Sequence, residues 1–222
     1  MAKEMLNWLF GKDKSGGARQ APPYEKAREI AATGSVKDRA KLAAHEDLDP
    51  EFLYFFATDE SDEVRKVVAG NEGTPLQADR ILAEDKNAAV RIELAGKISK
   101  LIPGLSKREN DKVTEMAMEV LEVLARDELP KVRAIIAEET KHLDYLPKPM
   151  VERLARDAED SVSVPILEFS TLLNESELIQ IIAGGIKGGA LEAVARRKNV
   201  TEPVADAVAD TGEVPAMIAL LK

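Results

Sequence analysis

The chain has 222 residues, of which 45% are hydrophobic and 32% charged, and its net charge is −9. An acidic surface repels a phosphate backbone, so nucleic acid is not expected among the partners. With no cysteine in the sequence, disulfides, thiolate nucleophiles and cysteine-based zinc sites are excluded, and a reducing, cytoplasmic location is expected. No apolar run approaches the roughly 18 residues of a membrane span. The aromatic content of only 4% favours helices over strands.

Residues 1–20 are predicted to form a flexible amino-terminal segment ahead of the folded part. A Ser-Gly-Gly run at 15–17 has the composition of a linker. Four bulky apolar side chains precede it and are flanked by lysines: Leu6, Trp8, Leu9 and Phe10. Two interpretations stay open. These side chains dock onto a partner, or make a weak peripheral contact with a membrane surface; or they fold back and cap the open end of the first repeat.

From residue 21 onward the sequence repeats itself. A shift of 26 residues aligns Arg39 with Arg65 and Arg65 with Arg91, and the following shifts are 42 and 30 residues. A small residue next to large ones allows helices to approach closely, so each unit is predicted to be a pair of short helices. One alanine position recurs, usually after bulky apolar residues: Ala31, Ala57, Ala83, Ala125, Ala155, Ala183 and Ala209.

The predicted helices have recognisable starts. Thr74 and Thr201 are predicted N-caps. The interval of 42 residues is predicted to hold helices at 88–101 and 111–126, joined by a lengthened loop with a Pro-Gly turn. Prolines stand near several helix starts, where a missing N–H costs little: Pro50, Pro75, Pro147 and Pro203.

Short helical pairs cannot bury their apolar faces alone, so they stack on one another. We therefore predict an all-α fold, a HEAT-like α-solenoid in which about seven helical hairpins form a right-handed superhelix. Residues 21–222 are expected to be a single solenoid. Because the sequence stops at Leu220-Leu221-Lys222, inside an expected second helix, it is predicted to be a truncated part of a longer chain.

Three units share an aspartate that precedes an arginine by six residues, and each of these arginines follows a valine. The pattern resembles the HEAT repeat, and the resemblance implies a hydrogen-bonded ladder between neighbouring repeats. It stops at the next unit, where Ser163 follows Asp157 by six residues. The ladder residues are Asp59 and Arg65, Asp85 and Arg91, and Asp127 and Arg133.

The carboxy-terminal half carries a second resemblance. The run Val-Pro-Ile-Leu-Glu-Phe-Ser at 164–170, with Ala-Arg-Arg at 195–197 and Val-Ala-Asp-Thr-Gly at 208–212, is similar to bacterial domain-of-unknown-function family 2336, found mainly in alphaproteobacteria. The resemblance extends over residues 30–222. It implies a HEAT-like fold and brings no activity, cofactor or catalytic residue.

No group of residues has the spacing of a catalytic or metal site. His45 and His142 are the only histidines, and neither has a second histidine at helical spacing. The glycine-rich segment 184–189 lacks the Lys-Ser or Lys-Thr of a phosphate-binding loop, so it predicts a helix C-cap and a turn. We expect no enzyme, cofactor or metal; the alternative is an enzyme or small-ligand-binding protein with a site on the concave face.

The function favoured by these observations is that of a scaffold or adaptor for an unidentified protein partner. The position three residues before the recurring alanine is polar in six of seven units, which indicates that it faces water. Tyr54 is the exception. A partner surface is therefore predicted around Tyr54, together with Leu53, Trp8 and Phe10, while Phe52, Phe55 and Phe56 are expected in the core.

Overall fold

The computed structural model describes residues 21–105 and 111–221, and within these ranges it contains α-helices and no strands. The predicted all-α fold is confirmed. The helices are α2 (Tyr24–Thr33), α3 (Val36–Ala43), α4 (Pro50–Phe56), α5 (Asp62–Gly70), α6 (Leu76–Ala83), α7 (Ala88–Leu105), α8 (Asp111–Leu124), α9 (Pro130–Thr140), α10 (Lys148–Ala155), α11 (Asp160–Phe169), α12 (Glu175–Ala183), α13 (Gly188–Ala195), α14 (Glu202–Asp210) and α15 (Val214–Ala219).

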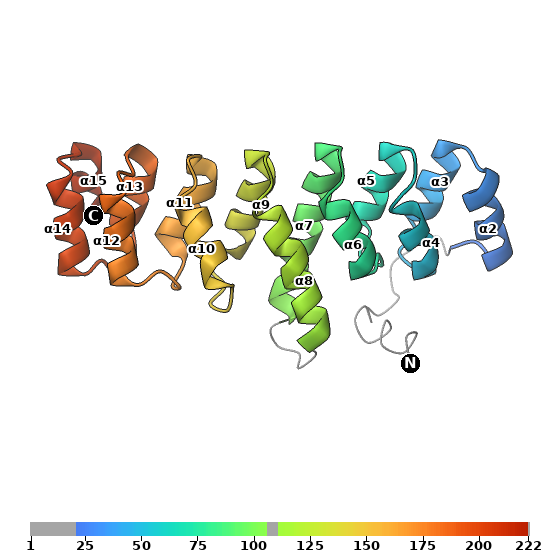
Figure 1. Ribbon diagram of the computed structural model, residues 1–222, viewed down its shortest axis with the longest axis horizontal. Helices are drawn as coiled ribbons and strands as arrows, with labels where there is room; N and C mark the ends of the chain where they lie inside the picture. The colour runs from blue at the N-terminus through green and yellow to red at the C-terminus, as the bar shows by residue number, and fades with distance from the viewer. Residues whose placement is uncertain (1–20, 106–110, 222) are drawn as a thin grey trace. The chain divides into compact units, whose positions relative to one another are not determined.

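The chain divides into two compact units. The first comprises the described residues up to Ile98 together with Asp111–Val120, and the second comprises the described residues from Ser99 to Leu105 and from Leu121 onward. In the first unit, α4 packs between α2 and α6, while α3 packs against α5 (Figure 1). In the second unit, α9, α11, α13 and α15 pack one after another, and α12 packs against α14.

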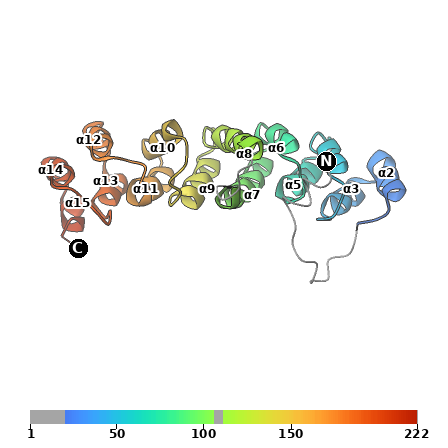
Figure 2. The ribbon, with the colours of Figure 1, turned by 90° about the horizontal axis from the view of Figure 1, so that it is seen from below.

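Each unit therefore has two layers of alternate helices, as Figure 2 shows for α2, α4 and α6 beside α3 and α5. Pairs consecutive in the chain, such as α4 with α5 and α10 with α11, connect the layers. This arrangement is consistent with the predicted α-solenoid. The HEAT-like character and the handedness of a superhelix stay predictions.

Prolines begin the helices as predicted. Pro50 occupies the first turn of α4, and Pro75 and Pro147 directly precede α6 and α10. The predicted capping role of Thr74 is wrong. Because its hydroxyl is buried, it donates to the carbonyl of Val68 (2.7 Å) at the end of α5. Thr201 stands at the N-cap position of α14 without a capping hydrogen bond from its side chain.

The recurring alanine lies in the core in the middle of the series but not at its end. Ala57, Ala83 and Ala155 are buried, whereas Ala183 and Ala209 are exposed. The side chain just before the alanine is buried in these helices, as Ile182 and Val208 show for α12 and α14. In α12 and α14 the alanine itself no longer belongs to the buried face, and the alanine pattern is weak there.

Helix α7 is longer than the predicted 88–101. It continues through Pro103 to Leu105, because Ile102 and Leu105 are buried and hold the last turn against the core of the second unit. The carbonyl of Ile102 accepts a hydrogen bond from the hydroxyl of Tyr145 (3.1 Å). Residues 102–105, predicted as loop, are thus helical, and α8 ends at Leu124 rather than at residue 126.

Candidate interaction surface

The arginines of the repeat bind the aspartate of the following helical pair. Arg65 on α5 donates from Nε and Nη2 to both carboxylate oxygens of Asp85 (2.5 and 3.1 Å). Its Nη1 donates to the carbonyl of Asp59 (2.7 Å). The two side chains are almost fully buried, with exposed fractions of 7% and 5%. Each arginine therefore joins two successive repeats with a bidentate, charge-assisted contact.

Two further arginines make the same contacts. Arg133 binds the carboxylate of Asp157 (2.6 and 3.0 Å) and the carbonyl of Asp127 (2.7 Å). Arg39 binds the carboxylate of Asp59 (2.7 and 2.9 Å). Arg91 donates to the carbonyl of Asp85 (2.7 Å).

The spacing of six residues has a structural explanation. The aspartate carbonyl accepts from the arginine six residues later, whereas its carboxylate accepts from the arginine of the preceding pair. The carboxylate also accepts from the backbone N–H two residues on, as Asp157 does from Glu159 (3.0 Å). Asp157 therefore belongs to the ladder as the acceptor for Arg133. It has no arginine six residues later, because Ser163 occupies that position.

Two of the ladder carboxylates, Asp59 and Asp157, have a lowered pKa. Burial alone would raise the pKa of Asp157, but the Arg133 guanidinium and the N–H of Glu159 outweigh burial and place the pKa below its usual value. The pKa of Asp59 is lowered for the corresponding reasons, with Arg39 as the cation. A carboxylate whose pKa is lowered by folding stabilises the fold at pH values above the ordinary aspartate pKa of about 4. This stabilisation is lost as the pH falls below that value, towards the lowered pKa of the folded state.

A second set of hydrogen bonds also links neighbouring pairs. Its donors, Asn71 and Lys97, lie six residues after the ladder arginines Arg65 and Arg91, and the sequence did not predict it. The Asn71 side chain donates to the carbonyls of Ala43 (2.7 Å) and His45 (3.0 Å) beyond the end of α3. One pair later, Lys97 Nζ donates to the carbonyl of Asn71 (3.3 Å). These side chains supply donors to the carbonyls that a helix end leaves free. The 26-residue shift aligns His45, Asn71 and Lys97 and could have revealed this set.

Lys97 also forms a buried ion pair. Its Nζ lies 2.5 Å from Asp79 Oδ1, and the two side chains are 9% and 1% exposed. Burial raises the pKa of Asp79 to about 6, although Lys97 opposes this. Burial also lowers the pKa of Lys97, with Asp79 acting in the other direction. The 26-residue shift aligns Asp79 with Leu53 of the preceding pair. The buried carboxylate on α6 therefore has no counterpart on α4.

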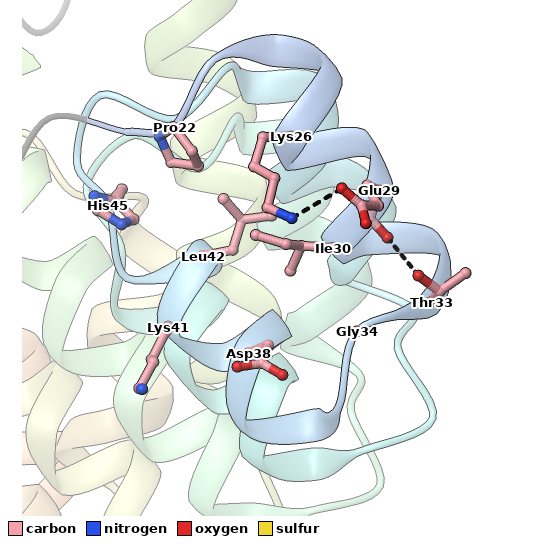
Figure 3. A pocket seen from close by; sticks show the side chains of 10 residues that line it. All are labelled: Pro22, Lys26, Glu29, Ile30, Thr33, Gly34, Asp38, Lys41, Leu42 and His45. Carbon is pink, nitrogen blue, oxygen red and sulfur yellow. Dashed lines mark hydrogen bonds and ion pairs between the residues drawn. The ribbon is translucent and has the colours of Figure 1, made fainter.

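A groove of about 420 Å³ runs between α2 and α3 (Figure 3). Its lining is largely polar: Lys26 is paired with Glu29 (2.9 Å), and Asp38 accepts a hydrogen bond from Ser35. Apolar side chains, Ile30 and Leu42 among them, form its floor.

This groove has the character of a polar end cap. A shift of 26 residues places Phe52 at the position of Lys26 and Val64 at the position of Asp38, and both Phe52 and Val64 are buried. The first pair thus carries charges where the next pair presents apolar residues to its neighbour. The charged side chains Lys26 and Asp38 already have partners in Glu29 and Ser35, so we place no ligand site here.

The predicted exposure of Tyr54 is confirmed, but two neighbours differ from expectation. Tyr54 and Phe55 are 49% and 58% exposed, whereas Leu53 is completely buried. The assignments of Phe55 to the core and of Leu53 to the surface are therefore wrong. At about 100° per residue, Phe52, Leu53 and Phe56 share one face of α4, while Tyr54 and Phe55 lie on the other. Trp8 and Phe10 lie outside the described residues.

Ile81 extends this apolar exposure to the next helix. It occupies on α6 the position of Phe55 on α4, 26 residues earlier, and is 38% exposed. We call Tyr54, Phe55 and Ile81 the outer apolar surface. Helix α4 already packs between α2 and α6, and α6 is joined to α8 by the Arg80–Glu119 ion pair (3.4 Å). Packing against the neighbouring helices therefore does not cover the outer apolar surface, which remains exposed to solvent.

Other apolar side chains are exposed on α11 and α15. The ring of Phe169 at the end of α11 is contacted by the His142 ring (centroids 5.1 Å apart) and by Lys141 Nζ (4.7 Å from the centroid). On α15, the last described helix, Val214, Met217 and Ile218 are exposed as well.

The glycine-rich segment forms the predicted helix end and turn between α12 and α13. Gly185 and Gly188 have positive φ angles of 86° and 54°. The N–H of Gly188 donates to Glu213 Oε2 (2.9 Å), and a Cβ at Gly189 would lie 2.5 Å from Asp160 Oδ2. Two carboxylates thus already occupy the start of α13, where a phosphate would have to bind.

The described parts of the chain contain neither a metal-binding cluster nor a helix suited to crossing a membrane. Residues 21–105 and 111–221 contain no cluster of three or more histidine, aspartate or glutamate side chains arranged to hold a metal ion. None of the helices in these ranges combines the length and apolar character that a membrane crossing requires.

A comparison with protein families gives a match in the carboxy-terminal part of the chain. The model of a family described as an uncharacterised protein conserved in bacteria, DUF2336, matches residues 162–222, which run from α11 to the end of the chain. None of the curated proteins matches the chain. The match is narrower than the predicted 30–222, and it confirms the predicted similarity over residues 162–222. This carboxy-terminal part of the chain is therefore similar to the bacterial family DUF2336.

Proposed function

We propose that the chain is a protein-interaction scaffold that performs no catalysis of its own and binds a partner protein through the outer apolar surface. One observation carries the proposal: Tyr54 and Phe55 are exposed side by side on α4, and Tyr54 occupies a position where the aligned helices carry polar side chains. Exposed single apolar residues are common, but a clustered patch marks interaction sites. With no cysteine in its sequence, we place the protein in the cytoplasm.

The composition of the surface fits protein recognition. Tyrosine supplies a large contact area and a polar hydroxyl, and aromatic residues are enriched among the residues that dominate binding energy. The flanking exposed side chains are polar and of both signs, including Glu51 on α4 and Arg80 and Glu84 on α6. An apolar centre with a charged rim is the usual anatomy of a non-obligate interface.

Replacing Tyr54 and Phe55 together with glutamate is expected to weaken partner binding strongly while leaving the fold intact. Both side chains face solvent, so the fold loses little packing. A buried charge at a central interface position should cost about 2 kcal/mol or more, a roughly 30-fold loss of affinity. The test is affinity capture from the native host with quantitative mass spectrometry, followed by titration of the purified partner against wild type and variant.

The matched control is Gln180→Glu. Gln180 is exposed on α12 and occupies the position of Tyr54 in that unit, so this variant adds a charge to an equivalent site elsewhere. It should bind like wild type. Retention of every partner by the Tyr54→Glu/Phe55→Glu variant, with its melting temperature unchanged, would show that the surface is not an interface.

A further inference from the structure

The outer apolar surface is flanked by a carboxylate on each of its two helices. Glu51 lies on α4, three residues before Tyr54 and four before Phe55, so it precedes them by one helical turn on the same side. Glu84 lies three residues after Ile81 at the end of α6 and follows it by one turn. Both glutamates are exposed. The apolar centre therefore lies between two negative charges.

The repeat fixes the spacing of these two carboxylates. Helices α4 and α6 pack side by side (Figure 1), and residues 50–58 show the same pattern of buried and exposed side chains as residues 76–84. Under this alignment Glu84 takes the position of Thr58, which lies seven residues, or about 10 Å along the helix axis, beyond Glu51. Neighbouring helix axes are about 8–10 Å apart, so the carboxylates are separated by roughly 14 Å across the apolar centre.

The basic side chain at this surface is already paired. Arg80 on α6 forms its ion pair with Glu119 of α8 (3.4 Å). The exposed charged side chains on α4, on α6 with its C-cap and on the part of α8 in the first unit give a net charge of −2. The acidic ones are Glu51, Glu84, Glu115 and Glu119, and the basic ones are Arg80 and Lys112. A partner therefore meets an acidic rim.

The position of Glu84 is not explained by the stability of α6. Glu84 is the C-cap of this helix, and the carbonyl end of a helix favours a positive charge. Other helices follow this preference, with Lys141, Arg156 and Arg196 at the C-caps of α9, α10 and α13. A negative charge at the end of α6 is locally unfavourable, whereas it suits a cation that a partner brings to the surface.

The size of the surface favours a short segment of a partner over a second copy of the chain. Tyr54 and Phe55 expose about half of their side chains and Ile81 exposes 38%, which amounts to roughly 300 Å² of largely apolar area. A stable dimer buries about 800 Å² on each partner, and homodimer interfaces are more apolar than others. In a two-fold dimer this surface would meet itself, so its net negative charge would oppose association.

We infer that the outer apolar surface binds a short basic amphipathic segment of the partner protein. An apolar side chain of the segment seats on Tyr54, Phe55 and Ile81, and a lysine or arginine on each side of it pairs with Glu51 and Glu84. The inference rests on the proposed function of this surface. Arginine suits the site, because its guanidinium can stack on an aromatic ring and bind a carboxylate. The same carboxylates repel an anionic membrane or a nucleic acid.

Three designed peptides test the inference on the purified full chain. The first is a fluorescein-labelled helical peptide with leucines along one face and lysines on both sides of them. The second has the same composition in an order that leaves no apolar face, and the third has glutamate in place of lysine. Fluorescence anisotropy should show that the first peptide binds, and more weakly as salt is added, and that the other two bind at least tenfold more weakly. Absent binding of the first peptide, or equal binding of either of the others, overturns the inference.

Charge reversal at the rim should weaken the first peptide selectively. In Glu51→Lys/Glu84→Lys two attractions become repulsions, so the affinity at low salt should fall by about tenfold. The matched control is Asp206→Lys/Asp210→Lys, which makes the same change of net charge at exposed positions on α14 and should bind like wild type. An equal loss in both variants would show that net charge alone attracts the peptide, and the inference would be wrong. Circular dichroism establishes that each variant is folded.

The apolar centre is tested by Tyr54→Ser/Phe55→Ser, which adds no charge and should also lose the first peptide. The capture experiment separates this inference from the proposed function. If captured partners are lost with Tyr54→Glu/Phe55→Glu but bind Glu51→Lys/Glu84→Lys as tightly as wild type at low and high salt, the surface is an interface for a segment that is not basic. Retention of the partners by Tyr54→Glu/Phe55→Glu contradicts the proposed function itself.

Discussion

Replacing Lys97 with methionine is expected to lower the free energy of unfolding by about 3–5 kcal/mol at pH 7. Lys97 is the cation 2.5 Å from Asp79, and both side chains are almost entirely buried. Without Lys97, the Asp79 carboxylate must stay charged in a low-dielectric core or bind a proton. The Nζ hydrogen bond to the carbonyl of Asn71 is lost as well. Chemical denaturation of wild type and variant measures the difference.

The pH dependence of this deficit identifies its cause. The pKa of Asp79 is already raised to about 6 with Lys97 present, and removing the cation must raise it further. Protonation removes the buried charge, so the deficit of Lys97→Met should shrink as the pH falls from 8 to 5. In Asp79→Asn the buried charge is the lysine ammonium. Burial lowers the pKa of Lys97, so that deficit should shrink in the opposite direction, as the pH rises towards 10.

The double variant Asp79→Leu/Lys97→Met separates charge from packing. Leucine stands at the corresponding position of the preceding pair, where Leu53 is fully buried. Replacing a buried ion pair by apolar residues of similar volume is often neutral or stabilising. The double variant should therefore recover most of the stability that either single substitution loses. A deficit equal to the sum of the two single deficits would contradict this account.

Replacing Arg65 with alanine is expected to cost about 3 kcal/mol of unfolding free energy. The substitution leaves the buried Asp85 carboxylate without its bidentate partner and removes the donor from the carbonyls of Asp59 and Glu60. Lysine at this position should recover only part of the loss, because an ammonium cannot reproduce the planar bidentate contact. Calorimetric melting of both variants tests the expectation.

The control for this prediction is Arg80→Ala in the same unit. Arg80 pairs with Glu119 at 3.4 Å, but the two side chains are 72% and 51% exposed. Exposed ion pairs contribute little, so the change should stay within about 0.5 kcal/mol. A loss for Arg65→Ala no larger than that for Arg80→Ala would show that the ladder does not stabilise the unit.

Local sequence patterns were sufficient to predict much of the helical architecture. Prolines at Pro50 and Pro75 fix helix starts because their ring suits the first turn and their missing N–H is not needed there. The 26-residue shift reveals the repeat because stacked pairs must present the same small and apolar residues to each other. Tyr54 could be identified as exposed from its six polar counterparts, and the family match at residues 162–222 agrees with motifs visible in the sequence.

The tertiary structure decided the features that depend on how neighbouring pairs meet. The sequence shows that Asp85 and Arg65 recur, but only packing shows that the arginine binds the aspartate 20 residues later. The orientation of a seven-residue helix is set by its neighbours, so Leu53 is buried and Phe55 exposed although both are apolar. Asp79 and Lys97 form an ion pair between two helices, and their separation of 18 residues in the sequence matches no known motif. Hydrophobic burial is non-directional, so composition predicts that a core forms, whereas the geometry of packing selects which side chains enter it.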